Sequence, residues 1–126
     1  MALSIDHIVL TVRSVEKSLT FYEQALGMRR EIAAGRPAAV AFGAQKINLH
    51  QVDQTFEPKA AKPAPGTADF CLVTDRPLEE ISRAIQAAGA SIELGPVSRT
   101  GARGPMTSLY FRDPDGNLVE VSRYPD

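Results

Sequence analysis

Hydrophobic and polar residues alternate along several short segments, a pattern that predicts β-strands buried on one face. In residues 4–12, Ile8, Leu10 and Val12 share one face, whereas the opposite face carries His7. Further strands are expected at 28–33, 38–42 and 46–51, because these segments are apolar and are separated by glycine-containing turns. The first half of the chain therefore contains one strand, an intervening segment and three more strands.

The intervening segment has helical spacing, with apolar residues on one side from residue 15 to residue 26. Ser14 precedes it as an N-cap and Gly27 follows it as a stop. The second half repeats this plan, since 62 residues separate His7 from Asp69 and also Gly27 from Gly89. The repeat predicts a helix at 78–88 and strands at 91–94, 107–112 and 117–123.

Two segments interrupt the predicted strands and helices. Residues 53–66 contain Pro58, Pro63 and Pro65 and suit a linker or an ordered arm between the two halves. Residues 95–105 contain two arginines and no acid, so they are a candidate lid or anion-binding loop.

The faces opposite the apolar ones carry polar side chains, which would converge if the two halves curve into one trough. These residues are His7, Asn48, His50, Asp69, Ser108, Tyr110 and Glu120. Two imidazoles and two carboxylates are a suitable donor set for a divalent metal.

Some of these residues also have simpler interpretations. A histidine such as His7 is often a half-exposed strand residue, and Asp69 can cap a turn. Arg99 and Arg103 can be solvated loop charges. Glu120 is the stronger candidate, because a carboxylate in the middle of an alternating strand must be paired, protonated or exposed on an open face.

Composition narrows the class of protein. The chain has 126 residues, of which 44% are hydrophobic and 23% charged, as in one soluble globular domain. A net charge of −1 gives no basic field for nucleic acid. No apolar run approaches the roughly 20 residues of a membrane span, and the start MALSIDH lacks secretion-signal features, so we expect a cytoplasmic protein without a membrane partner. We interpret the one cysteine, Cys71, as a small apolar side chain.

Three motifs carry a resemblance to a known family. DHIVLTV, SVEKSLTFYEQALGM and SLYFRDPDGNLVEV together resemble the vicinal oxygen chelate superfamily of glyoxalase I, fosfomycin-resistance and extradiol dioxygenase proteins. The segments FGAQKINLH, FEPKAA and GPVSRTGARGP resemble more narrowly the proteins called glyoxalase domain-containing protein five, whose bacterial relatives often carry the label virulence protein.

The resemblance implies an α+β fold in which paired βαβββ modules form an eight-stranded curved trough, usually in a homodimer. One glyoxalase-like domain would then span residues 1–126, with module one at about 4–52, a linker at 53–66 and module two at about 67–124. The trough would hold a divalent metal, which the donor types allow to be nickel, zinc, manganese or iron(II).

Family positions can be transferred to this sequence one at a time. The metal-ligand positions of glyoxalase-type members match His7, Asn48, Asp69 and Glu120. Asn48 stands where glyoxalase I has glutamate and Asp69 where it has histidine, and His50 is the residue that would substitute for Asn48. The implied metal ligands are therefore His7, His50, Asp69 and Glu120.

Further roles follow from the same resemblance. Glu120 and Tyr110 are the expected catalytic residues. The substrate would contact residues that match those near the charged group in fosfomycin-modifying relatives, together with the neutral amide of Asn48 and the arginines of the 95–105 segment. These expected substrate-binding residues are Asn48, Ser108, Arg99 and Arg103.

The activity that this set favours is a metal-dependent lyase or isomerase, similar to lactoylglutathione lyase, acting on a small oxygenated or thiol-conjugated metabolite. An asparagine at position 48 cannot act as a base, which weakens the case for glyoxalase I activity itself. Alternatives are a metal-free, ligand-sequestering protein of the bleomycin-resistance type and a fosfomycin-type transferase that opens an epoxide. An extradiol dioxygenase is disfavoured, because it requires histidine at the second ligand position and usually a longer chain.

Overall fold

The computed structural model describes residues 2–126, and this range contains two α-helices and eight β-strands. In chain order they are β1 (His7–Val12), α1 (Val15–Leu26), β2 (Arg29–Glu31), β3 (Ala38–Phe42), β4 (Gln45–Gln51), β5 (Asp69–Val73), α2 (Leu78–Ala87), β6 (Leu94–Gly101), β7 (Gly104–Arg112) and β8 (Leu118–Arg123). The predicted pair of βαβββ modules is confirmed. Neither helix within residues 2–126 is both long and apolar enough to cross a membrane.

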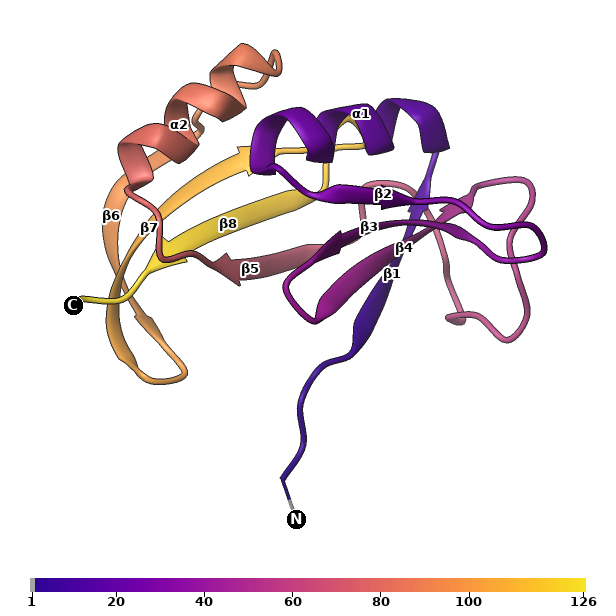
Figure 1. Cartoon of the computed structure of the whole chain (residues 1–126), viewed down its shortest axis with the longest axis horizontal. Coiled ribbons are helices and arrows are strands. Elements are labelled where there is room, and N and C mark those ends of the chain that lie inside the picture. Colours follow the sequence, from indigo (N-terminus) through magenta and orange to yellow (C-terminus); the bar gives the residue numbers. More distant parts are fainter. Residues whose placement is uncertain (1) are drawn as a thin grey trace.

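The strands of residues 2–126 form two four-stranded sheets, one from each module. Their orders are β1-β4-β3-β2 and β5-β8-β7-β6, and in both sheets the first pair is parallel and the others are antiparallel. Strands β1 and β5 are therefore edge strands. Both helices lie on the same side of the two sheets, and we call the other side of each sheet its open face (Figure 1).

Local sequence signals explain why α1 has the predicted boundaries. The Ser14 side chain accepts a hydrogen bond from the Lys17 backbone N–H at 3.2 Å, which satisfies one of the free donors of the first turn. Gly27 ends the helix with φ 68°, a left-handed conformation that glycine adopts without strain.

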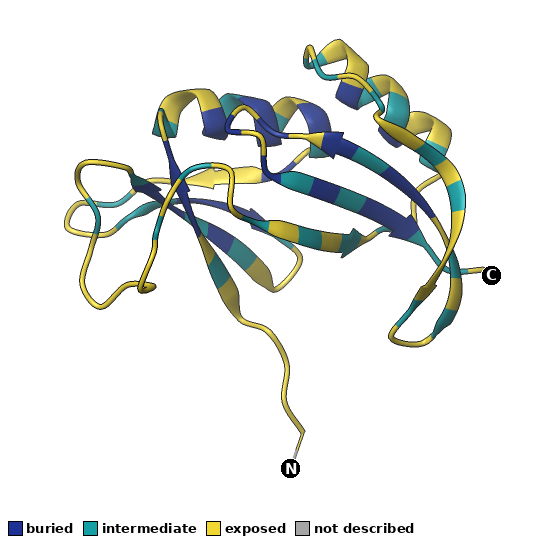
Figure 2. Ribbon diagram, turned by 180° about the vertical axis from the view of Figure 1, so that it is seen from behind, coloured by how far each residue is buried: buried dark blue, intermediate teal, exposed yellow. Residues whose placement is uncertain are grey.

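The hydrophobic core lies between the helices and the sheets. The inward positions of alternating strands supply Leu10, Ile47, Leu109 and Val121, each at most 3% exposed. Residues from both modules form one continuous cluster, which accounts for the alternation of buried and exposed positions along the strands (Figure 2). The two modules consequently share a single core.

The Asp113–Asn117 turn is a second link between the modules. Asp113 Oδ2 accepts a hydrogen bond from the Tyr22 hydroxyl at 2.7 Å, and its Oδ1 accepts from the backbone N–H groups of Asp115 and Asn117. Asp115 Oδ1 in turn accepts from the Arg13 backbone N–H at 2.9 Å. The turn of module two is thus held by residues of module one.

Some predicted boundaries and one predicted element were wrong. The 95–105 segment is a β-hairpin rather than a lid or loop, because most of it belongs to β6 and β7. Its glycines and prolines favoured a loop, but pairing of Val97 with Ser108 and of Arg99 with Met106 satisfies the backbone. The register shift between Leu94 and Val97 accommodates the Gly95–Pro96 dipeptide. The first strand begins at His7, not at residue 4.

Candidate functional site

The open face of the first sheet carries both histidines of the chain. His7 begins β1 and is exposed, with Nδ1 2.8 Å from the Asp6 carboxylate. His50 lies near the end of β4, where the parallel register places it beside Thr11. The two imidazoles share a face but are separated along the sheet by four residues, about 13 Å of strand.

His50 is buried and packs against an aromatic ring of the linker. The residue is 6% exposed, and its ring lies 5.2 Å from the ring of Phe56 in the linker. Burial lowers the pKa of His50 below its usual range, which favours the neutral imidazole. His50 is therefore packed against the linker.

Asn48 occupies the middle of β4, beside Val9 of β1. Its side-chain oxygen is buried and has no hydrogen-bond partner among the described residues. Asn48 also lines a cavity of about 510 Å³ together with Glu31, Arg36 and Lys46. The unpaired Asn48 oxygen thus lies in a cavity that three cations, Arg30, Arg36 and Lys46, also line, and its contact with a substrate stays a prediction.

The open face of the second sheet holds Glu120 at its centre. The strand register places Cys71 of β5 on one side of Glu120 and Tyr110 of β7 on the other. Asp69 begins β5 two residues before Cys71, so it is a diagonal neighbour of Glu120. This sheet brings together the two carboxylates and the tyrosine that the sequence analysis singled out.

A buried serine pair orients the Glu120 carboxylate. Ser122 donates its hydroxyl hydrogen to Glu120 Oε2 at 3.2 Å, and its oxygen lies 2.6 Å from Ser108 Oγ and 3.1 Å from Cys71 Sγ. Because the single hydrogen of Ser122 is used on Glu120, the Ser108 hydroxyl is the donor between the two serines. Burial raises the pKa of the Cys71 thiol, so it remains protonated at neutral pH.

This arrangement leaves Ser108 without access to a substrate. The residue is fully buried, and its hydroxyl is committed to Ser122. In this structure Ser108 supports Glu120 through Ser122. The sequence analysis missed Ser122, although the i, i+2 alternation of a strand places it on the same face as Glu120.

The two arginines of the β6–β7 hairpin lie in different places. Arg99 Nε donates a hydrogen bond to the Tyr110 hydroxyl at 2.9 Å, with its guanidinium carbon 5.3 Å from the ring centre. Arg103 lies at the hairpin turn, with its guanidinium 4.2 Å from the centre of the Tyr124 ring, and lines another cavity with Arg123 and Asp75. Arg99 therefore adjoins the row that contains Glu120, whereas Arg103 does not.

The predicted metal ligands have suitable chemistry but are divided between the sheets. The imidazoles of His7 and His50 belong to the first sheet, and the carboxylates of Asp69 and Glu120 belong to the second. Among residues 2–126 no group of three or more His, Cys, Asp and Glu side chains is arranged to hold a metal. A single chain therefore does not assemble the predicted donor set, whose use as ligands stays a prediction.

Comparison with known proteins assigns the fold to a family. The model of the Glyoxalase/Bleomycin resistance protein/Dioxygenase superfamily matches residues 4–121. The chain belongs to this superfamily, which confirms the resemblance inferred from its motifs.

Two relatives in sequence cover most of the chain. Virulence protein STM3117 of Salmonella typhimurium is 51% identical over 120 residues, which are 95% of this chain and 83% of that protein. Glyoxalase domain-containing protein RDO1 of Mycosarcoma maydis is 46% identical over 124 residues, which are 98% of this chain and 69% of that protein.

Solved structures agree with this assignment. The crystal structure of STM3117 has a TM-score of 0.93 and 49% identity, covering 99% of each chain. An integron cassette protein from the mobile metagenome of V. cholerae has a TM-score of 0.92 and 50% identity, covering 99% of this chain and 98% of that one. The arrangement of modules is therefore shared with these proteins.

Proposed function

We propose that the protein is a glyoxalase-like lyase or isomerase that acts on a small oxygenated or thiol-conjugated metabolite. The observation that carries this proposal is the row Cys71, Glu120 and Tyr110 on the open face of the second sheet, with Arg99 beside it. Glu120 is half-buried and is oriented by Ser122, as a residue that moves a proton must be. Membership of the superfamily supports the same class of reaction.

Glu120, Tyr110 and the adjoining Arg99 each have a task in the proposed reaction. Glu120 accepts a proton from the substrate and returns it to a neighbouring atom, which is an isomerisation or, when a bond breaks, a lyase reaction. Arg99 supplies positive charge for an anionic substrate group. Tyr110 accepts a hydrogen bond from Arg99, so its own O–H remains available to donate to a substrate oxygen.

A divalent metal is part of the proposal, with its donors drawn from two copies of the chain. The imidazole of His7, with His50 as a further candidate, would come from one copy, and Asp69 and Glu120 from the other. Such an ion, when bound, polarises substrate oxygens as a Lewis acid. Because one chain gathers no three donors within residues 2–126, we derive no reaction step through the metal.

The edges of the two sheets support a homodimer. Among the strands of residues 2–126, β1 and β5 each have one unpaired side, and Val9 and Val73 on their open faces are 46% and 55% exposed. Unpaired edges with apolar side chains are suited to burial against another chain. A second copy of this chain would cover both edges at once by a two-fold axis.

The first test measures metal content after purification without a histidine tag. Chelator-stripped protein is then titrated with nickel, zinc, manganese and iron(II), alongside His7→Ala and Glu120→Ala. We expect about one metal per chain in the unmodified protein and its loss in both variants. Arg103→Ala is the control, because Arg103 lies at another cavity. Failure of all four ions to bind more tightly than millimolar contradicts the metal-dependent proposal.

Co-expression of the two variants tests whether the metal is shared between chains. In a mixed dimer of His7→Ala and Glu120→Ala chains, one interface site carries both substitutions and the other carries neither. We expect about half a metal per chain in such a mixed dimer and none in either pure variant. A mixed dimer without metal places all ligands within one chain.

A metal-free, ligand-sequestering protein is the second candidate. It is favoured by the division of the donors between two sheets, which leaves each single chain without a group of three within residues 2–126. It predicts no stoichiometric metal and ligand binding that survives Glu120→Ala. Fosfomycin and other epoxides belong in the activity screen, since their consumption with a thiol would favour the transferase alternative.

A further inference from the structure

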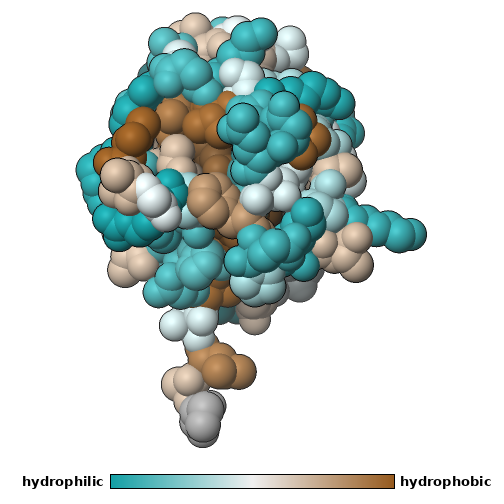
Figure 3. Space-filling view, turned by 90° about the vertical axis from the view of Figure 1, so that its right-hand side faces the viewer, coloured by the Kyte–Doolittle hydropathy of each residue, from teal (hydrophilic) through white to brown (hydrophobic). Residues whose placement is uncertain are grey.

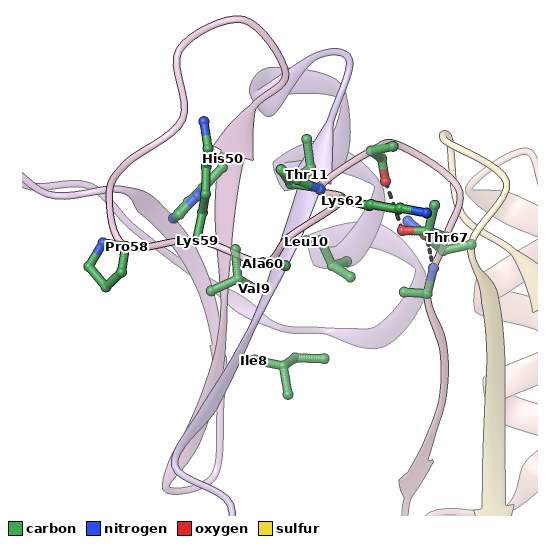
Figure 4. A pocket seen from close by; sticks show the side chains of 14 residues that line it. Ile8, Val9, Leu10, Thr11, His50, Pro58, Lys59, Ala60, Lys62 and Thr67 are labelled. Carbon is green, nitrogen blue, oxygen red and sulfur yellow. Dashed lines mark hydrogen bonds between the residues drawn. The ribbon is translucent and has the colours of Figure 1, made fainter.

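A cavity of about 590 Å³ lies between β1 and the linker that joins the modules. Its wall on the β1 side includes Ile8, Val9 and Leu10, with Pro58 of the linker facing them (Figure 4), and Pro63 also lines it. The described residues that line it include none of His7, Asp69 and Glu120. We call this space the linker cavity.

Residues at both ends of the linker contact other parts of the chain. At one end the ring of Phe56 packs against His50 at 5.2 Å. At the other end the Ala68 backbone N–H donates to Asn117 Oδ1 at 3.0 Å, and the Thr67 hydroxyl donates to the Ala64 carbonyl oxygen at 2.9 Å. Three prolines restrict the chain between these anchors. Binding therefore carries little cost of loop ordering.

The walls of the linker cavity are mostly apolar. Besides the β1 residues, Ala60, Ala64 and Ala68 contribute methyl groups, and Thr11 and His50 add a small polar area. Figure 3 views the side of the molecule that carries the linker and shows apolar surface framed by hydrophilic side chains. A volume in this range and a lining of this kind are typical of small-molecule sites.

The charge of the lining has one sign. Lys59 and Lys62 line the cavity, and its described lining residues include no Asp or Glu. Lys59 is already engaged, with Nζ 3.2 Å from the Glu57 carboxylate and 3.1 Å from the Thr55 hydroxyl. Lys62 forms no ion pair with any residue of 2–126. One ammonium group without an ion-pair partner, on the exposed side chain of Lys62, therefore borders an apolar space.

We propose that the linker cavity binds a small monocarboxylate with an apolar body, with Lys62 paired to the carboxylate and the body against Ile8, Val9 and Leu10. One ammonium group without an ion-pair partner matches one negative charge. A neutral ligand of the same shape would not form the ion pair with Lys62 and would bind more weakly. The site uses none of the residues assigned to proton transfer, but it shares His50 with the candidate metal ligands and Val9 with the proposed dimer edge, so to that extent it rests on the function proposed above.

The test uses 3-phenylpropionate as the probe and 3-phenylpropanamide as its neutral match. Binding of each compound is measured from the chemical-shift changes of the backbone amides in NMR spectra. We expect saturable shifts of residues 8–11 and 58–68 with 3-phenylpropionate and about tenfold weaker binding of the amide. Lys62→Gln should weaken the binding of 3-phenylpropionate until its affinity equals that of the amide. Lys59→Gln is the matched control and should change the affinity less than about twofold, because Lys59 is paired with Glu57.

Two further variants separate this proposal from the others. Ala64→Leu places extra methyl groups at the cavity wall and should abolish the shifts while the folded spectrum is retained. Glu120→Ala should bind the probe like the unmodified protein, so failure of the enzyme proposal leaves this one standing. Equal effects of Lys62→Gln and Lys59→Gln, equal affinity for acid and amide, or shifts centred on Glu120 would each overturn it.

Discussion

Tyr22 donates its phenolic hydrogen to Asp113 Oδ2 at 2.7 Å, and this contact joins the helix of module one to the turn of module two. Tyr22 is fully buried and Asp113 is 5% exposed, so neither group has water as a replacement partner. Asn117 Nδ2 also donates to Asp113 Oδ2, at 2.8 Å. A buried carboxylate that accepts several hydrogen bonds is a strong constraint on the relative position of the modules.

Tyr22→Phe should lower the free energy of unfolding by about 1–2 kcal/mol, because it removes one charge-assisted hydrogen bond while Asp113 keeps its other donors. Urea denaturation followed by circular dichroism measures this change. Tyr110→Phe is the control, since the Tyr110 hydroxyl lies on the open face and should contribute less than about 0.5 kcal/mol. Equal effects of the two substitutions would contradict the role of the buried bond.

Burial of Tyr22 also leads us to expect a loss of stability at alkaline pH. Burial, with the negative charge of Asp113 beside it, raises the pKa of Tyr22 well above its usual value of about 10. The unfolded chain therefore loses this proton at lower pH than the folded chain, and the contribution of Tyr22 is complete below pH 10 and declines above it. The stability difference between the unmodified protein and Tyr22→Phe should shrink as pH rises from 8 to 11. A constant difference across this range would count against the assignment.

Gly95 should be much less tolerant of substitution than Gly35. A Cβ at Gly95 would lie 2.5 Å from the Ser108 backbone oxygen, and φ is +120°. Gly35 also has positive φ, +76°, but a Cβ there meets nothing within 4 Å. Gly35→Ala therefore isolates backbone strain, at about 1 kcal/mol, whereas Gly95→Ala should cost at least about 2 kcal/mol. Thermal unfolding of both variants compares them directly.

Ser108 and Ser122 should be energetically coupled. Ser122→Ala leaves the buried Ser108 hydroxyl without its acceptor, and we expect a loss of about 1–3 kcal/mol in unfolding free energy. The double variant should lose less than the sum of the two single variants, with a coupling of about 0.5–2 kcal/mol. Ser98→Ala, at an exposed position, is the control. Strict additivity in urea denaturation would show that the two hydroxyls act separately.

Local patterns were sufficient for much of the fold. Helical spacing with Ser14 as the cap and Gly27 as the stop predicted α1 to the residue, because these signals act within one or two turns. Alternation correctly placed Glu120 and Tyr110 together on the face away from the core, since strand periodicity depends only on position along the chain. The 62-residue repeat predicted the two modules for the same reason.

Other features depended on contacts between distant segments. The 95–105 segment contains strand residues because β6 pairs with β7. Its glycines and prolines are typical of a loop, so the local sequence does not indicate this pairing. The burial of His50 depends on Phe56, and the use of Ser108 as a support for Glu120 depends on Ser122. None of these partners is identified by a local pattern.

The sequence alone determined the family, the two βαβββ modules and the polar side chains that face away from the core. Tertiary structure decided which of those side chains meet: Glu120 lies beside Tyr110, whereas His7 and His50 belong to the other sheet. It also created the cavity beneath the linker, with Lys62 at its border. The physical reason is that periodicity assigns a residue to a face, whereas distances between residues on different strands depend on the register and packing of segments remote in the chain.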